Sequence, residues 1–343
     1  MPSPDALRFL ALVAALLLPQ FAHAQTPLTG AAIVQYHRFG EDDIPATNIK
    51  IVQFEAHVAE LTSGKYAVMA LPGVVEWLRT GHALPDRAVT VTIDDPFLSV
   101  YAQAWPRLKA AGIPFTVFLH TDVLDAGRGG RNMTWAQVKE MAAAGVTMGL
   151  SGAVPQHYPE KSREAIAADV AKSVAAFTRE LGVAPALFAY PFGEMSLPAR
   201  EVVRAAGFTA AFGQHSGVAE AGLDPFFLPR FALNETFGTL ERFVLDVNTL
   251  PFGARDIEPA DPVVRTNRPV LVFSIDAAVG RLSPLNCFAS HENTAAQVTQ
   301  VGERRFEVRA NTPMPLGRGR ISCTMAAGQN RFRWFGEQLF VVQ

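Results

Sequence analysis

The feature that most constrains the fold is an alternation of short apolar strands with amphipathic helices between residues 31 and 250. The β-branched segment Ala88–Ile93 predicts a strand, and the helical pattern of Val100–Ala111 ends at Gly112. The apolar segment Pro114–Leu119 then predicts the next strand. A strand, helix, strand rhythm of this kind is typical of parallel sheets, so we expect an α/β barrel or sheet.

A different pattern follows in the C-terminal part of the chain. Residues 254–268 are rich in proline and charge and are predicted to be a linker after a domain of residues 25–253. Residues 269–343 contain short alternating segments between Gly, Asn and Pro turns, which is typical of a small antiparallel β-sandwich. The two cysteines, Cys287 and Cys323, both lie in this segment and predict a disulfide in an oxidising compartment.

The N-terminal segment has the pattern of a secretory signal. Phe9–Leu18 is an unbroken apolar run, too short to span a bilayer, and Ala22-His23-Ala24 has the small-x-small form of a cleavage site. We therefore interpret residues 1–24 as a signal peptide, with a buried N-terminal helix as the alternative, and expect a periplasmic or extracellular protein. The formal net charge of −2 and the lack of a long basic run give no indication of nucleic-acid binding.

Two adjacent carboxylates follow a predicted strand directly. Asp94 and Asp95 come after Ile93, and the carboxyl ends of barrel strands are where such folds place their chemistry. One aspartate could act as a general base while the other holds a metal ion. Pro96 removes an N–H group and restricts the conformation of Asp95. The alternative is a helix N-cap, where aspartate is also favoured.

Several segments follow one another in a recognisable order. They are Tyr36-His37-Arg38, Thr92-Ile93-Asp94-Asp95-Pro96-Phe97, Thr134-Trp135-Ala136-Gln137-Val138, Phe188-Ala189-Tyr190-Pro191-Phe192-Gly193 and Leu228-Pro229-Arg230-Phe231. Their order resembles the polysaccharide deacetylase family over residues 31 to 235. The resemblance implies a distorted, incomplete TIM-type (β/α) barrel and metal-dependent hydrolysis of the N-acetyl carbon–nitrogen bond of an amino-sugar polymer.

The resemblance implies a role for individual residues. Asp94 corresponds to the general base, and Asp95 to a ligand of zinc or a similar divalent metal. An N-acetylated polysaccharide is the implied partner, bound in a groove with aromatic walls. The residues expected to contact it are Tyr36, Phe97, Tyr190, Phe192 and Arg230.

The chain departs from the family pattern where two metal-binding histidines are expected. Those positions hold Ser151 and Pro155. A neutral hydroxyl is a poor zinc ligand, and proline has no donor atom in its side chain. His157 lies two residues further on and is either a replacement ligand or a loop histidine. His37 and His120 are either polar groups at the rim of the barrel or replacement ligands.

Two classes of function remain open at this stage. The first is a deacetylase that uses zinc or a similar metal, either in the family arrangement or in a site rebuilt around His157 or His37. His215, after a predicted strand, would then supply the protonating acid, or else it only makes hydrogen bonds in a loop. The second is a non-catalytic glycan-binding or cell-envelope assembly protein on the same fold, which needs no metal.

Overall fold

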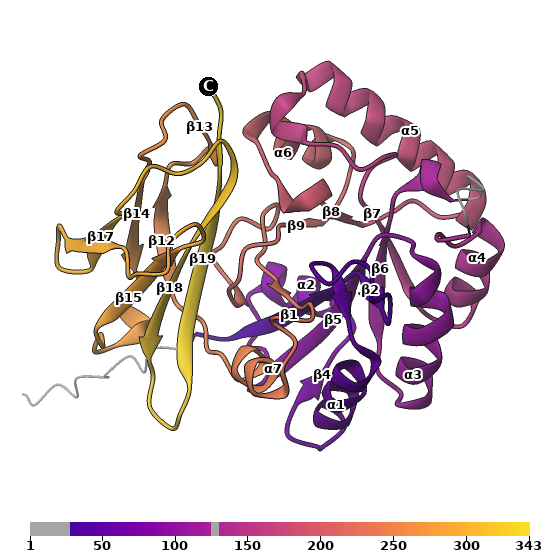
Figure 1. Cartoon of the computed structure of the whole chain (residues 1–343), viewed down its shortest axis with the longest axis horizontal. Helices are drawn as coiled ribbons and strands as arrows, with labels where there is room; N and C mark the ends of the chain where they lie inside the picture. The colour runs from indigo at the N-terminus through magenta and orange to yellow at the C-terminus, as the bar shows by residue number, and fades with distance from the viewer. Residues whose placement is uncertain (1–27, 125–129) are drawn as a thin grey trace, which may run out of the picture.

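The computed structural model describes residues 28–124 and 130–343 (Figure 1). The predicted signal peptide, residues 1–24, lies outside the described residues. Among the residues that are described, no helix is both long and apolar enough to cross a membrane.

A curled, mostly parallel sheet forms the larger part of the structure. Its strands run in the order β10-β1-β5-β6-β7-β8-β9, with β11 paired to β1 and β4 paired to β5. In the described part of the chain the sheet ends at β9 and β10 without closing, so the prediction of an incomplete (β/α) barrel is confirmed. The strands are β1 (Gly30–Tyr36), β4 (Ala67–Val68), β5 (Ala88–Asp94), β6 (Phe115–Leu119), β7 (Thr147–Leu150), β8 (Leu187–Ala189), β9 (Ala210–Phe212), β10 (Ala219–Glu220) and β11 (Phe231–Ala232); β2 (Arg38–Phe39) and β3 (Asn48–Ile49) form a separate pair.

Helices follow most barrel strands and pack around the outside of the sheet (Figure 1). The helix predicted over Val100–Ala111 begins as a π-helix over Val100–Ala104. Pro106 has no N–H to donate to the carbonyl of Ala102, so a regular α-helix cannot be continuous here. The helix at residues 240–247 was not predicted. The α-helices are α1 (Ile51–Leu61), α2 (Leu71–Thr80), α3 (Trp105–Ala110), α4 (Trp135–Ala143), α5 (Arg163–Leu181), α6 (Leu197–Ala205) and α7 (Leu240–Val247).

The C-terminal part consists of two facing sheets, as predicted. One has the strand order β12-β14-β17-β16 and the other β13-β19-β18-β15, and a separate apolar core fills the space between them. Cys287 and Cys323 are register partners on β15 and β18 and form the predicted disulfide. The strands are β12 (Ala254–Glu258), β13 (Val263–Val264), β14 (Val270–Ile275), β15 (Leu285–Ala289), β16 (Gln297–Gln300), β17 (Arg305–Arg309), β18 (Gly317–Ala326) and β19 (Phe332–Val341).

One expectation for this region is wrong. The segment 254–268 is not a linker, because it supplies β12, which pairs with β14, and β13, which pairs with β19. The strand β19 is continuous through Gly336, so this glycine is not a turn residue. It allows close packing, since a Cβ there would collide with the carbonyl oxygen of Ser216.

The β18–β19 face of the C-terminal sheets packs against the barrel (Figure 1). Gln338 Nε2 donates to the carbonyl of Gly193 at 2.9 Å. A cavity of about 210 Å³ lies at this junction, and the carboxyl groups of Glu220 and Glu337 border it. Both glutamates are buried, so the junction contains acidic groups that are shielded from water.

The burial of Glu337 predicts a pH dependence of stability. Desolvation raises the pKa of its carboxyl to about 8, and the hydrogen bond from Gln338 N opposes this only in part. The folded state therefore holds a proton that the unfolded state releases at its ordinary pKa of 4.5. The stability contributed by this proton is complete at low pH and is lost as the pH rises towards 8.

We expect the free energy of unfolding of the wild type to fall between pH 5 and pH 8 by more than that of the Glu337→Gln variant. Urea unfolding at both pH values measures the difference. Glu303→Gln, at an exposed glutamate, is the matched control and should behave as the wild type. Parallel pH profiles for the wild type and Glu337→Gln would contradict the prediction.

Candidate functional site

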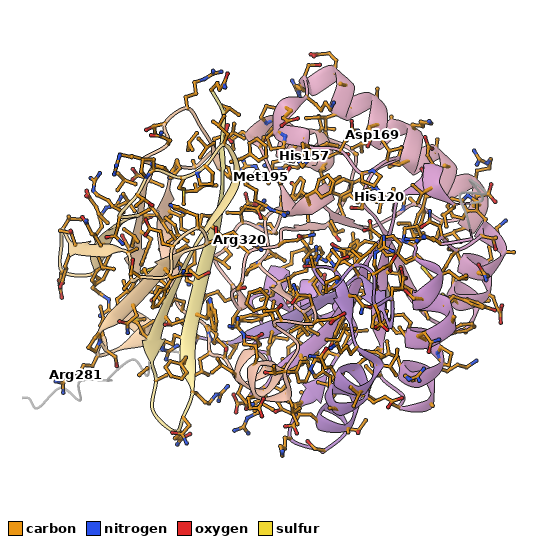
Figure 2. All side chains as sticks on the ribbon, viewed as in Figure 1. His120, His157, Asp169, Met195, Arg281 and Arg320 are labelled. Carbon is orange, nitrogen blue, oxygen red and sulfur yellow. A yellow bond between two sulfur atoms is a disulfide. The ribbon has the colours of Figure 1, made fainter. Side chains whose placement is uncertain are left out.

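A cleft of about 660 Å³ lies between the carboxyl ends of the barrel strands and the C-terminal sheets. Parts of the chain far apart in sequence form its walls. Figure 2 shows two of these side chains, His120 from the barrel and Arg320 from β18. On the barrel side the lining includes His37, Asp94, Asp95, His120, Ser151, Pro155, Phe192, Gln214, Phe237 and Arg242, and on the C-terminal side Phe288, Ser290, Glu292, Arg318, Arg320, Ser322 and Trp334.

Asp94 is fixed at the base of the cleft by residues from neighbouring strands. It is the last residue of β5, and β1 lies between β5 and β11 in the sheet. The register places Gln35 of β1 beside Thr92 of β5, and Arg230 directly precedes β11. The two guanidinium N–H groups of Arg230 donate to Asp94 Oδ1 at 2.6 Å and Oδ2 at 2.8 Å, and Gln35 Nε2 donates to Oδ2 at 2.6 Å.

This arrangement holds Asp94 as a carboxylate that only accepts hydrogen bonds. A two-pronged arginine contact is among the strongest ways to fix an ionised carboxylate. Arg230 is completely buried and Asp94 is 4% exposed, so neither charge is compensated by water. Each of the two charges therefore depends on the other for its place in the fold.

Asp95 points its carboxylate into the cleft from a strained backbone. Its φ of 70° lies in the left-handed region, which is uncommon for a residue other than glycine. Its N–H donates to the carbonyl of Phe118 at 3.0 Å, and its Oδ1 lies 3.2 Å from His120 Nε2. Burial raises the pKa of Asp95, but the hydrogen bond and charge of His120, together with the charges of His37 and Arg38, outweigh burial and lower that pKa.

The residues around Asp95 do not fit the metal site that the family resemblance implies. A catalytic zinc ion takes three protein ligands and a water. The buried hydroxyl of Ser151 donates to the carbonyl of Ala189 at 2.7 Å, and Pro155 has no donor atom. Among the described residues, no group of three or more His, Cys, Asp or Glu side chains is arranged to hold a metal ion.

His157 does not act as a replacement ligand in this arrangement. Its Nδ1 lies 2.6 Å from Glu194 Oε2, and its ring stacks on Phe192 at a centroid distance of 4.4 Å. It is not part of the cleft lining. The prediction that His157 joins Asp95 at a metal ion is therefore wrong, whereas His37 and His120 do line the cleft, as expected for rim residues.

Three of the predicted substrate contacts are wrong because two of the side chains are buried and the third packs outside the cleft. Tyr36 is 1% exposed and its hydroxyl is hydrogen-bonded to His57 Nδ1 at 2.9 Å. Tyr190 has no exposed surface. Phe97 lies under the guanidinium of Arg38, 3.5 Å from its ring centroid, and is not part of the cleft lining. Each belongs to an aromatic motif of the sequence, but the motif does not determine whether a ring faces the core or the cleft.

The two remaining predicted contacts have different outcomes. Arg230 cannot touch a substrate, since it is completely buried, and it holds Asp94 instead. Phe192 does line the cleft and is 37% exposed. Its backbone φ of 57° lies in the left-handed region, in the short turn after β8.

His215 is not placed to act as the protonating acid. It lines the cavity at the junction with the C-terminal sheets, not the cleft that contains Asp94. Burial lowers its pKa to about 3, with a further contribution from the positive charges of Arg230 and Arg320. A neutral imidazole near pH 7 has no proton of suitable acidity to give to a leaving amine.

Sequence reasoning missed several residues of the cleft. Gln35 is a polar residue inside an otherwise apolar strand, and that break in the pattern was the available signal. Arg318 and Arg320 have the alternate spacing of one face of a strand, but nothing in the sequence pairs that strand with the barrel. The other missed residues are Gln214, Phe237, Phe288 and Trp334.

Comparison with known proteins supports the resemblance found in the sequence. Residues 81–211 match the family described as Polysaccharide deacetylase. The chain is 22% identical over 237 residues to a poly-beta-1,6-N-acetyl-D-glucosamine N-deacetylase of Escherichia coli (strain K12), covering 57% of this chain and 35% of the relative. The match therefore spans about a third of that relative's length. A Staphylococcus aureus (strain MSSA476) enzyme of the same description is 24% identical over 198 residues, which are 53% of this chain and 67% of the relative.

Solved structures show the same fold. IcaB from Ammonifex degensii is 26% identical, with a TM-score of 0.57, over 64% of this chain and 98% of its own. The deacetylase PplD of Streptococcus pyogenes has a TM-score of 0.59 at 19% identity, over 65% of this chain and 99% of its own. The polysaccharide deacetylase resemblance and the half-barrel fold are thus confirmed for the barrel part of the chain.

The Asp94–Arg230 pair predicts a strong, coupled effect on stability. Removing the guanidinium in Arg230→Gln leaves a buried carboxylate unpaired and should lower the free energy of unfolding by about 3–5 kcal/mol. The double variant Asp94→Asn with Arg230→Gln should lose less than the sum of the two single variants, because it buries no lone charge. Urea unfolding of the four proteins measures the coupling.

The exposed pair of Arg79 and Glu76 on α2 is the matched control. Arg79→Gln should change the stability little, because solvent screens this pair. Additive losses in the Asp94–Arg230 cycle would contradict the prediction.

Proposed function

We propose that the chain is a polysaccharide deacetylase-type protein whose cleft binds an N-acetylated amino-sugar polymer. The two curated relatives compared above are by name N-deacetylases of a poly-N-acetylglucosamine. In this proposal the barrel, residues 25–253, and the C-terminal β-sheets act as one exported, polymer-binding unit. Its place of action is the periplasm or the outside of the cell.

The observation that carries the proposal is the carboxylate of Asp94, which is held in one orientation inside a cleft lined by aromatic rings. Phe192, Phe237 and Phe288 line the cleft and are 37%, 50% and 45% exposed. Exposed aromatic rings around a polar cleft are typical of a ligand-binding groove, because each ring offers an apolar face to a ligand. Asp94 lies in the same cleft, held in one orientation by Arg230 and Gln35.

Hydrolysis of the N-acetyl amide is the reaction for which Asp94 is suited. A carboxylate fixed at the mouth of the barrel can accept a proton from an attacking water. Its orientation does not depend on the substrate, since both oxygens are already held by Arg230. This is the base half of a deacetylase site.

The donor set around Asp95 favours the second candidate function, polymer binding without metal-dependent hydrolysis. The hydroxyl of Ser151 is committed to a backbone carbonyl, and His157 is committed to Glu194. A carboxylate paired with His120 offers no three-ligand site for zinc. In this second function, the chain binds the polymer in a cleft of deacetylase type and does not hydrolyse it.

Polymer binding is tested with an oligosaccharide of β-1,6-linked N-acetylglucosamine. Phe288→Ala should weaken its binding roughly tenfold, because the variant removes an exposed ring from the wall of the cleft. Isothermal titration calorimetry measures the dissociation constant. Phe332→Ala is the matched control, since Phe332 is 39% exposed but lies outside the cleft, and it should bind as the wild type does. Equal losses in both variants, or no binding by the wild type, would refute the proposal.

Metal content separates the two candidate functions. After dialysis against trace zinc, we expect elemental analysis to find far less than one zinc per chain and no change in Asp95→Ala. Acetate release from the same oligosaccharide should stay at the background rate. Near-stoichiometric zinc that is lost in Asp95→Ala would instead establish hydrolysis in a rebuilt site, and Asp94→Asn should then abolish acetate release.

A further inference from the structure

One face of β18 forms part of the C-terminal wall of the cleft. Arg318, Arg320 and Ser322 alternate along this strand and line the cleft, whereas Ile321 and Cys323 between them are buried in the core of the C-terminal sheets. Residues two apart on a strand lie on the same face, roughly 6–7 Å apart. The two guanidinium groups are therefore neighbours that face the barrel side of the cleft. Figure 2 shows Arg320 on this strand, at the border with the barrel.

Neither guanidinium is neutralised by a carboxylate among the described residues. Arg318 Nη1 donates to the carbonyl of Phe192 at 2.6 Å, and Arg320 Nη1 donates to the carbonyl of Gln214 at 3.1 Å. These contacts orient the arginines across the cleft but leave most of their five N–H donors without a partner in residues 28–124 and 130–343. Burial lowers the pKa of Arg320, and the positive charge of Arg318 lowers it further.

The other Asp, Glu and Arg side chains that line the cleft in the described part of the chain are already paired. Asp94 and Asp95 are bonded to an arginine and a histidine of the barrel. Arg242 is bonded to Asp246 at 2.9 Å, and the carboxylate of Glu292 is occupied by hydrogen bonds from the loop after β17. The positive charge that remains available to a ligand is thus concentrated at one place, on β18.

On the barrel side, the carboxyl group of Glu194 is affected by the charge of Arg318, but it already has a hydrogen-bond partner. The positive charge of Arg318 acts on the carboxyl of Glu194, but that group is hydrogen-bonded to His157 at 2.6 Å. Two adjacent like charges, one of them largely buried, are unfavourable unless a counter-charge joins them. The chain itself does not supply this counter-charge within the described residues.

We propose that Arg318 and Arg320 form a binding subsite for a carboxylate-bearing sugar residue of the polymer, so that the preferred ligand is an acidic, N-acetylated polysaccharide. The proposal rests on polymer binding in the cleft, and it assigns the C-terminal sheets a role in specificity. A planar guanidinium matches a carboxylate with two parallel hydrogen bonds, which a neutral sugar hydroxyl cannot accept in the same way. Phe192, Phe237 and Asp94 on the barrel side then face the neighbouring N-acetylated sugar.

The test compares two oligosaccharide probes of matched length. Hyaluronan oligosaccharides alternate glucuronate with N-acetylglucosamine, and chito-oligosaccharides carry N-acetylglucosamine alone. The wild type should bind the hyaluronan probe at least tenfold more tightly, and added salt should weaken this binding and leave that of the neutral probe unchanged. Calorimetry at two salt concentrations measures both effects.

Variants assign the preference to the two arginines. Arg318→Gln and Arg320→Gln should each reduce hyaluronan binding about tenfold or more and leave chito-oligosaccharide binding within twofold. Arg309→Gln, at an arginine on β17 paired with Glu307, removes the same charge away from the cleft and should change neither. Arg318 is exposed, so its variant keeps the test valid if Arg320→Gln does not fold.

The outcomes separate this inference from the proposed function. Equal or weaker binding of the hyaluronan probe by the wild type, or a preference that survives both substitutions, would overturn the acidic subsite. Chito-oligosaccharide binding would then still support polymer binding. Failure of the wild type to bind either probe would overturn the acidic subsite, and failure to bind the β-1,6-linked oligosaccharide as well would refute both proposals.

Discussion

The contact between Asp94 and Arg230 is the interaction on which the rest of the site depends. It joins the end of β5 to the residue before β11 across β1, so three strands of the sheet must be in register for it to form. Because both charges are buried, the pair is favourable only when it is complete. The same contact fixes the depth and orientation of a carboxylate in the cleft, which links the packing of the barrel to its chemistry.

Local sequence patterns predicted the barrel well because the burial of each strand and helix is reflected in the spacing of its own apolar residues. The β-branched segment before Asp94 is a buried strand, and the apolar segment predicted as the next strand contains β6. The disulfide between Cys287 and Cys323 also followed from the composition of one small region. The linker at 254–268 was wrong because strands at the edge of a sheet can carry proline and charge, and pairing partners cannot be read from that segment alone.

The site was predicted less well because its residues are selected by orientation and by contacts over long distances. Tyr36 and Phe192 both belong to aromatic motifs, yet one ring packs inside the barrel and the other faces the cleft. Arg230 was predicted to contact the substrate, but its side chain points into the barrel and binds Asp94. The C-terminal wall was not predicted, since no local pattern indicates that β18 packs against a barrel more than a hundred residues earlier.

His120 and the replacement of the expected histidines by Ser151 and Pro155 both concern how the carboxylate of Asp95 is stabilised. A carboxylate at the position of Asp95 needs a positive or donating partner, which a metal ion would supply in a three-ligand site. Here His120 Nε2 lies 3.2 Å from that carboxylate, while the serine at position 151 bonds to the backbone. His120 thus supplies a partner for the carboxylate of Asp95 from within the barrel, and Ser151 is held by the backbone of the neighbouring strand β8.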